Sequence, residues 1–209
     1  MAVRWRALGI AAALTLAIAA PAQSTSPKNL AIGKLLVANK NLVDPNFYHS
    51  VVLLVIYQND AVVGLVLNRR SRLSISSVFE VKEAKGRDDR VYHGGPVQPS
   101  STLALLRSST KPQGTTQVFS GVNLIAAESV LRKTMASTVQ PDSFRVFVGY
   151  AGWTARQLQD EVATGSWYIF PGDPKTIFDA DPQSLWDRLI ERTGGLFAVL
   201  RIGRVSASP

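Results

Sequence analysis

The sequence predicts a single α/β domain, of mixed α+β type, whose mixed, curved β-sheet or partial barrel is flanked by helices. Two apolar runs, at residues 50–57 and 61–68, are separated by only three turn residues, which is typical of a β-hairpin. Their continuous β-branched and aromatic character indicates strands that are buried on both faces. Helical segments alternate with further strands downstream, while the hairpin excludes a purely parallel sheet. A mixed sheet is therefore expected.

The remaining elements are expected in the following order. Further strands are expected at residues 33–38, 91–93, 102–106, 117–119, 144–150, 167–170 and 196–202. A short helix is expected at 74–80, a charged loop at 82–90, and longer helices at 125–136, 154–165 and 182–194. Thr154 and Gln157 stand in the register of a capping box, in which each side chain satisfies a backbone amide of the first turn. Asp181 and Pro182 are typical of a helix N-cap and first turn.

Residues 1–22 have the three zones of a secretory signal. Arg4 and Arg6 form a short basic region, residues 7–20 are an uncharged apolar run, and Ala20–Pro21–Ala22 supplies small residues for a signal peptidase. The apolar run is shorter than the roughly 20 residues that a membrane-spanning helix needs. We therefore expect cleavage near Ala22 and a periplasmic or secreted protein. An uncleaved membrane anchor is the alternative.

The rest of the chain has the size and composition of one globular domain. Without residues 1–22 the 209-residue chain is 187 residues long, enough for a sizeable core. The domain is expected over residues 31–204, after a flexible segment at 23–30 and before a disordered tail at 205–209. The chain contains no cysteine, which excludes disulfides, a cysteine nucleophile, a thiolate zinc site and lipid attachment to an N-terminal cysteine. A mature protein without a transmembrane segment is expected.

The chain is basic, with a formal net charge of +8, of which +6 remains when Arg4 and Arg6 are removed. Basic residues gather at 69–72, at 82–90 and at 132–133. A surface of this kind attracts phosphate backbones or anionic envelope polymers. A solvated basic face is the simpler interpretation, because acidic residues interrupt the second cluster and no aromatic residues alternate with the arginines.

The sequence indicates no metal site, no cofactor and no catalytic residue. His49 and His93 are the only histidines, and their separation does not form a short ligand motif. Neither a P-loop nor a dinucleotide-binding glycine motif is present. The neighbouring aspartates at 88–89 and at 179 and 181 lie at predicted turns or caps, where aspartate is common for backbone reasons.

Two glycine-rich turns form the candidate ligand-binding site. Backbone amides of the first turn, His93–Gly94–Gly95–Pro96, could bind an anion, although a tight turn with positive φ also explains its glycines. The second, residues 149–153, joins a strand to a capped helix, whose first amides favour an anion. Its aromatic residues line a pocket in one interpretation and belong to the core in the other. The candidate residues are His93, Gly94, Gly95, Tyr150, Gly152 and Trp153.

Several segments, taken in order, resemble the YqgE/AlgH family. They are Gly33–Ala38, Asp44–Val52, Gly64–Asn68, Gly94–Val97, Gly149–Trp153 with Gln157, Leu158 and Glu161, and Trp167. The resemblance extends from about Ile32 to Arg201 and implies a compact α/β domain with a strongly curved mixed sheet. The resemblance assigns no catalytic residue to this chain. Some members of the family are labelled as transcriptional regulators. The chain departs from the family pattern in its signal and in Leu105–Leu106, where relatives often have Leu-His.

Three functions are open at this point. The first is a non-enzymatic binding or regulatory module for a small anionic ligand or an envelope partner. The second is a hydrolase that uses the Gly94–Gly95 amides, with His93 close to a serine such as Ser100 or Ser101. The third is a nucleic-acid-binding protein or transcriptional regulator, which export disfavours.

Overall fold

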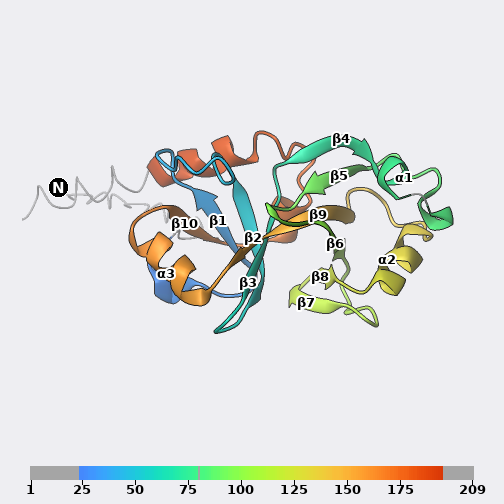
Figure 1. Cartoon of the computed structure of the whole chain (residues 1–209), viewed down its shortest axis with the longest axis horizontal. Helices are drawn as coiled ribbons and strands as arrows, with labels where there is room; N and C mark the ends of the chain where they lie inside the picture. The colour runs from blue at the N-terminus through green and yellow to red at the C-terminus, as the bar shows by residue number, and fades with distance from the viewer. Residues whose placement is uncertain (1–23, 80, 195–209) are drawn as a thin grey trace, which may run out of the picture.

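The structure is a computed structural model that describes residues 24–79 and 81–194, and its strands form one mixed, curved sheet (Figure 1). The main strand order is β10-β1-β2-β3-β9-β6-β8-β7; β4 pairs with β5, and β5 pairs with β9. Among the described strands only β5 and β9 are parallel neighbours. The α/β class and the mixed sheet are thereby confirmed. The strands are β1 (Lys34–Ala38), β2 (Val51–Tyr57), β3 (Val62–Val66), β4 (Arg70–Ser74), β5 (Arg90–His93), β6 (Val97–Arg107), β7 (Thr116–Phe119), β8 (Val122–Ile125), β9 (Phe144–Trp153) and β10 (Trp167–Pro171).

Strand β9 holds the two halves of the molecule together. Its first residues, 144–148, pair with β6, while Tyr92 and His93 of β5 pair with Phe147 and Val148 on its other side. Its last residues, 151–153, pair with β3. In Figure 1, β9 crosses the centre, with β1, β2, β3 and β10 on one side and β4 to β8 on the other. A residue on β9 therefore contacts both halves.

The helices cover the ends and faces of this sheet. They are α1 (Ile75–Val78), α2 (Glu128–Met135), α3 (Ala155–Ala163) and α4 (Pro174–Ile177), with short 3₁₀ turns at η1 (Pro27–Asn29) and η2 (Lys82–Ala84). Residues 185–194 form a further helix. The hydroxyl of Thr154 accepts the backbone N–H of Gln157 at 3.1 Å, as the N-cap prediction requires. The Gln157 side chain donates to Glu161 instead of reaching back to Thr154, so the second half of the predicted capping box does not form.

The core confirms the hairpin prediction. Residues 51–55 of β2 are buried, as are most residues of β3. Leu185, Trp186, Leu189 and Ile190 form the buried stripe of the last helix, as expected. That helix begins at residue 185, about one turn after the predicted start.

Other boundaries differ from expectation for reasons of packing. Strand β4 was not anticipated, because its mainly exposed or half-buried residues show no apolar run. Residue 125 ends β8 and does not open the helix, which begins at Glu128. Strands β6 and β9 extend beyond 102–106 and 144–150. In the segment 23–30, which is expected to be flexible, the Ser24 backbone exchanges two hydrogen bonds with Ile169.

The predicted signal at 1–22 and the predicted strand at 196–202 lie outside the described residues. Within the part of the chain that is described, no helix is both long and apolar enough to cross a membrane.

Candidate functional site

The two glycine-rich turns pack directly against each other. The N–H of Gly94 donates to the carbonyl of Val148 at 2.9 Å, so this amide belongs to the sheet. A Cβ atom on Gly95 would overlap the backbone of Tyr150, and one on Gly149 would lie 2.5 Å from the Gly95 carbonyl oxygen. The glycines therefore permit close approach of two backbones, with positive φ at Gly95 and Gly149.

Three of the sequence-predicted residues share one hollow. Tyr150, Gly152 and Trp153 line an open depression of about 340 Å³ together with Thr154 and the loop before β3. The Trp153 ring is buried in the core, as the alternative interpretation required, and only part of it reaches the hollow. His93 is exposed and does not line this hollow, nor do the two glycines that follow it.

His93 and the candidate serines lie on opposite sides of β9. His93 of β5 and Thr102 of β6 both pair with Val148, which places them two strand spacings apart, about 10 Å. Within the described residues no hydrogen bond joins the His93 side chain to Ser100 or Ser101. The structure therefore does not bring together the pair that the hydrolase hypothesis needs.

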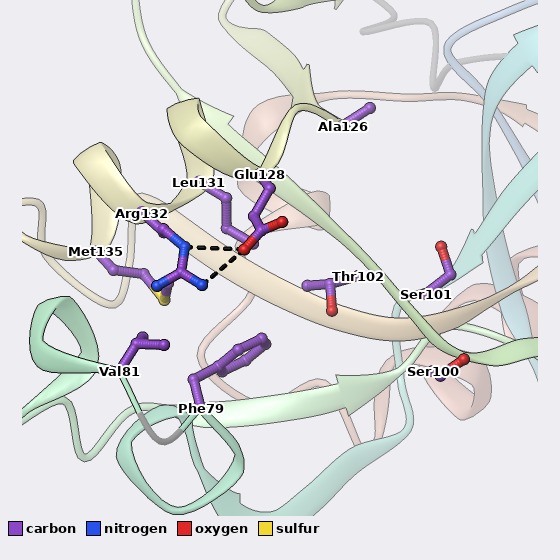
Figure 2. A pocket seen from close by; sticks show the side chains of 10 residues that line it. All are labelled: Phe79, Val81, Ser100, Ser101, Thr102, Ala126, Glu128, Leu131, Arg132 and Met135. Atoms are coloured by element: carbon purple, nitrogen blue, oxygen red, sulfur yellow. Dashed lines mark hydrogen bonds and ion pairs between the residues drawn. The ribbon is translucent and has the colours of Figure 1, made fainter.

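The serines line a separate pocket of about 380 Å³ between β6 and α2 (Figure 2). Ser100, Ser101 and Thr102 of β6 line one side, and Phe79, Val81, Leu131 and Met135 supply apolar surface. Glu128 and Arg132 pair with each other at 2.7 Å along α2, so their charges are already satisfied.

A different residue carries the most unusual environment of the fold. Arg145 on β9 is only 5% exposed, and it is the one charged residue that is buried in the described part of the chain. Removing a guanidinium from water costs several kcal/mol unless its N–H groups find partners. Burial accordingly lowers the pKa of Arg145 from its usual value.

Strand register places Arg145 on a common face with two other polar residues. Arg70 of β4 is directly opposite Tyr92 of β5, and Tyr92 is paired with Phe147 of β9. Directly paired residues share a face of the sheet, as do residues two apart on one strand. Arg70, Tyr92 and Arg145 therefore form a row across β4, β5 and β9.

The guanidinium of Arg145 is stacked and only partly hydrogen-bonded. Its carbon lies 4.8 Å from the ring centroid of Tyr92 and 5.9 Å from that of Phe178. Its Nη2 donates to the backbone carbonyl of Asp179. Its Nε and Nη1 are buried, and neither has a hydrogen-bond partner among the described residues. Because buried donors are nearly always paired in folded proteins, these two are the anomaly that marks the site.

Arg145 lines a pocket of about 280 Å³, with Arg70, Arg90 and Tyr92 on the β4–β5 side and Phe178 with Asp179 after α4. Burial raises the pKa of the Tyr92 phenol, and the charges of Arg145 and Arg70 partly offset that rise. The phenol is therefore a neutral group that can donate a hydrogen bond at ordinary pH.

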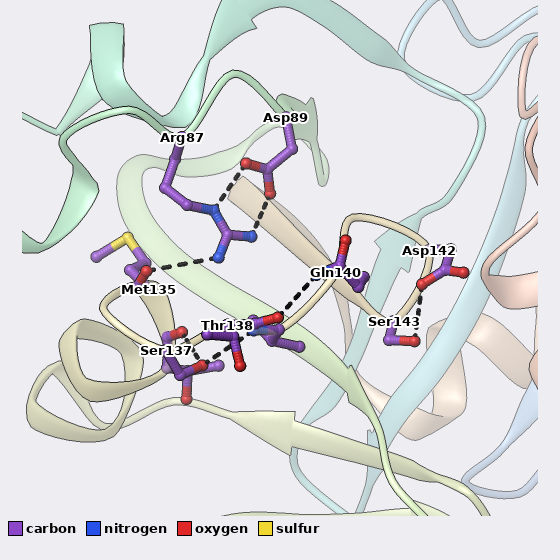
Figure 3. A network of polar contacts seen from close by, with 10 residues as sticks. Arg87, Asp89, Met135, Ser137, Thr138, Gln140, Asp142 and Ser143 are labelled. Atoms are coloured by element: carbon purple, nitrogen blue, oxygen red, sulfur yellow. Dashed lines mark hydrogen bonds and ion pairs between the residues drawn. The ribbon is translucent and has the colours of Figure 1, made fainter.

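Two of the three carboxylates that line this pocket, those of Asp89 and Asp179, are already neutralised by other arginines. Asp89 accepts two hydrogen bonds from Arg87, at 2.8 and 2.7 Å, and Arg87 also contacts the carbonyl of Met135 (Figure 3). Asp179 pairs with Arg188 at 3.0 Å. Arg145 is thus not the partner that either carboxylate needs, and the pocket is suited to an anion that comes from outside.

The sequence profile of the AlgH-like family matches residues 35–198. The chain belongs to this family. Its curated relatives include UPF0301 proteins of Thermobifida fusca, 36% identical over 79% of this chain and 88% of the relative, and of Myxococcus xanthus, 35% identical over 85% and 98%. The name UPF0301 states no activity.

Two solved structures have a similar fold, and one of them carries the AlgH name. The solution structure of the AlgH protein from Pseudomonas aeruginosa, 28% identical, has a TM-score of 0.61 and covers 93% of this chain and 98% of its own. A crystal structure of a protein from Corynebacterium diphtheriae has a TM-score of 0.66 over 78% of this chain and 87% of its own. At 21% identity the latter shows the fold alone.

In the sequence of this AlgH-like chain, the candidate ligand site was placed at the glycine turns and did not include Arg145. The signal in the sequence was a single arginine within the predicted strand 144–150, whose other residues are mainly apolar. In residues 24–79 and 81–194, no group of three or more histidine, cysteine, aspartate or glutamate side chains lies close enough to hold a metal ion.

Proposed function

We propose that the protein is a non-enzymatic binding module that takes a small anionic ligand in the Arg145 pocket. The observation that carries this proposal is the buried guanidinium of Arg145, whose Nε and Nη1 have no partner in the described part of the chain. A charged donor held in this way binds an anion strongly, because hydrogen bonds to ions are about twice as strong as neutral ones. The cost of burying the charge is then offset when the ligand is bound.

The walls of the pocket support a small ligand. The guanidinium carbon of Arg145 lies over the rings of Tyr92 and Phe178, and these cation–π contacts favour one position of the side chain. The volume of about 280 Å³ lies just below the range of typical ligand sites, which begins at about 300 Å³. The ligand is therefore a small metabolite-sized anion or the charged end of a larger molecule.

The experiment is calorimetric titration of the purified protein with a panel of small anions, before and after Arg145→Met. We expect saturable binding that Arg145→Met abolishes. Arg156→Met is the matched control, because Arg156 is 85% exposed on α3 and pairs only with Asp160. Equal binding by the protein and by Arg145→Met would contradict the proposal.

Export is a separate part of the proposal, and it rests on the basic, apolar and small-residue zones of residues 1–22. In the periplasm or outside the cell the ligand would be an envelope component or an external metabolite. Cell fractionation, with the N-terminus of the protein determined by mass spectrometry, tests this part. A full-length cytosolic product would overturn export and make the regulator label of the family relevant again.

A further inference from the structure

The charges around the Arg145 pocket do not cancel. Among its lining residues Arg70, Arg90 and Arg145 form no ion pair within the described part of the chain. Asp89 and Asp179 are paired with Arg87 and Arg188, which leaves Asp142 as the one lining carboxylate without an arginine partner. The pocket therefore carries a surplus of two positive charges.

Apart from the carboxylate of Asp142, the unpaired polar groups of this surface are donors. The Nε and Nη1 atoms of Arg145 are buried beside the pocket without a partner, and the exposed side chain of Arg70 lies across Tyr92 from them on the same sheet face. The Tyr92 phenol forms no hydrogen bond with the described residues and stays protonated, because burial raises its pKa. A ligand group that accepts several hydrogen bonds from different directions fits this arrangement better than a group with one acceptor.

We propose that the group bound beside Arg145 is a terminal phosphate monoester, a dianion that is recognised jointly by Arg145, Arg70 and Tyr92. This inference rests on the proposed function and narrows it. A monoester carries a charge of about −1.5 to −2 at neutral pH and has three acceptor oxygens. Its charge matches the surplus positive charge of the pocket, and its three acceptor oxygens match the hydrogen-bond donors of Arg145, Arg70 and Tyr92.

The same argument disfavours two other anions. A phosphate diester, such as the backbone of a nucleic acid, carries one negative charge per phosphate and would leave one positive charge uncompensated. A carboxylate also carries a single charge and has no third oxygen. The pocket thus distinguishes the end of a phosphorylated molecule from the middle of a nucleic-acid strand.

The test compares four small probes by calorimetric titration of the purified protein: methyl phosphate, dimethyl phosphate, acetate and sulfate. We expect methyl phosphate and sulfate to bind at least tenfold more tightly than the two monoanions. Between pH 5 and pH 7 the Kd of methyl phosphate should fall by about tenfold as its second proton leaves, with a pKa of about 6. The Kd of sulfate, a dianion throughout, reports any change in the protein over the same range.

Two variants assign the binding to the pocket. Arg145→Met is expected to weaken methyl phosphate binding by at least tenfold. Arg70→Ala changes an exposed side chain that forms no hydrogen bond or ion pair with the described residues, and it is expected to weaken binding by about threefold to fivefold. Arg156→Met is the control that should leave the affinity unchanged.

The outcomes separate this inference from the function on which it rests. If acetate or dimethyl phosphate binds as tightly as methyl phosphate, and Arg145→Met abolishes that binding, the monoester inference falls and the anion-binding function stands. If no probe binds, or Arg145→Met changes nothing, both fall. A further measurement compares binding of the protein to vesicles that contain phosphatidic acid, a monoester, with binding to vesicles that contain phosphatidylglycerol, a diester. It distinguishes a lipid headgroup from a soluble phosphate as the source of the ligand.

Discussion

Trp153 and Trp167 donate their indole N–H groups to the same carboxylate oxygen, Oε2 of Glu161, at 3.1 and 2.8 Å. The two rings meet edge to face with their centroids 6.1 Å apart, and Phe47 packs against both. Glu161 lies on α3, while the tryptophans end β9 and begin β10. One carboxylate therefore ties a helix to two strands of the sheet.

Replacement of Glu161 by alanine is expected to lower the free energy of unfolding by about 2–3 kcal/mol, because two buried indole donors lose a charged acceptor. Glu161→Gln keeps an acceptor oxygen and should lose about half as much. Urea denaturation measures both. The control is Glu128→Ala, which removes an exposed helix-surface pair and should change stability by less than about 0.5 kcal/mol. An equal effect of Glu161→Ala and Glu128→Ala would contradict a structural role for the carboxylate.

The approach of Gly149 to Gly95 makes a second prediction. Gly149 has φ of +67°, and a Cβ there would meet the Gly95 carbonyl oxygen. Gly149→Ala is therefore expected to lower the free energy of unfolding by about 2–4 kcal/mol, from backbone strain and overlap together. Gly165 has φ of +84° but nothing within 4 Å of its Cβ position, so Gly165→Ala should cost only about 1 kcal/mol. Thermal or urea denaturation of the two variants compares them, and equal losses would show that overlap is unimportant.

The elements that could be predicted from the sequence are those with a uniform run of apolar side chains or with a side chain that acts on its own turn. The β2–β3 hairpin was predictable because both strands are buried and uniformly apolar, and the Thr154 cap because its side chain acts locally. Strand β4 was not predictable, because its mainly exposed and half-buried arginines, serines and leucine show neither apolar alternation nor an apolar run. It is a strand only because β5 lies beside it.

The candidate site was less predictable than the fold for a related reason. The glycines at 94, 95 and 149 were recognisable as special, and the structure explains them by the close approach of two backbones. Arg145 depends on groups far away in sequence, since Tyr92 stacks on it from β5 and Asp179 accepts from it after α4. A single arginine in an apolar strand shows that something compensates its charge, but not which residues gather around it.

The burial of Tyr92 predicts how the stability of the protein depends on pH. Burial raises the pKa of its phenol in the folded protein, so above pH 10 the unfolded chain loses this proton more readily than the folded one. The contribution of the protonated Tyr92 phenol to the free energy of unfolding is complete below pH 10. It is lost as the pH rises through the pKa of the folded protein, and the free energy of unfolding then falls by up to about 1.4 kcal/mol per pH unit. Tyr92→Phe should flatten the decline in unfolding free energy measured from pH 9 upward. Tyr48→Phe, at a residue that is 53% exposed and does not line this pocket, is the matched control for removal of a phenol hydroxyl.

Arg145→Met separates a ligand-binding arginine from a structural one. If Arg145 is kept for its ligand, replacing its unpaired buried charge by an apolar side chain of similar length should leave the free energy of unfolding unchanged or raise it by up to about 2 kcal/mol. The same variant should lose anion binding, so stability and binding would change independently or in opposite directions. Urea denaturation without added anion, followed by titration with methyl phosphate, measures both. A loss of more than about 3 kcal/mol would instead assign to Arg145 the structural role of joining β9 to the Asp179 segment, because such losses follow when a needed buried partner is removed.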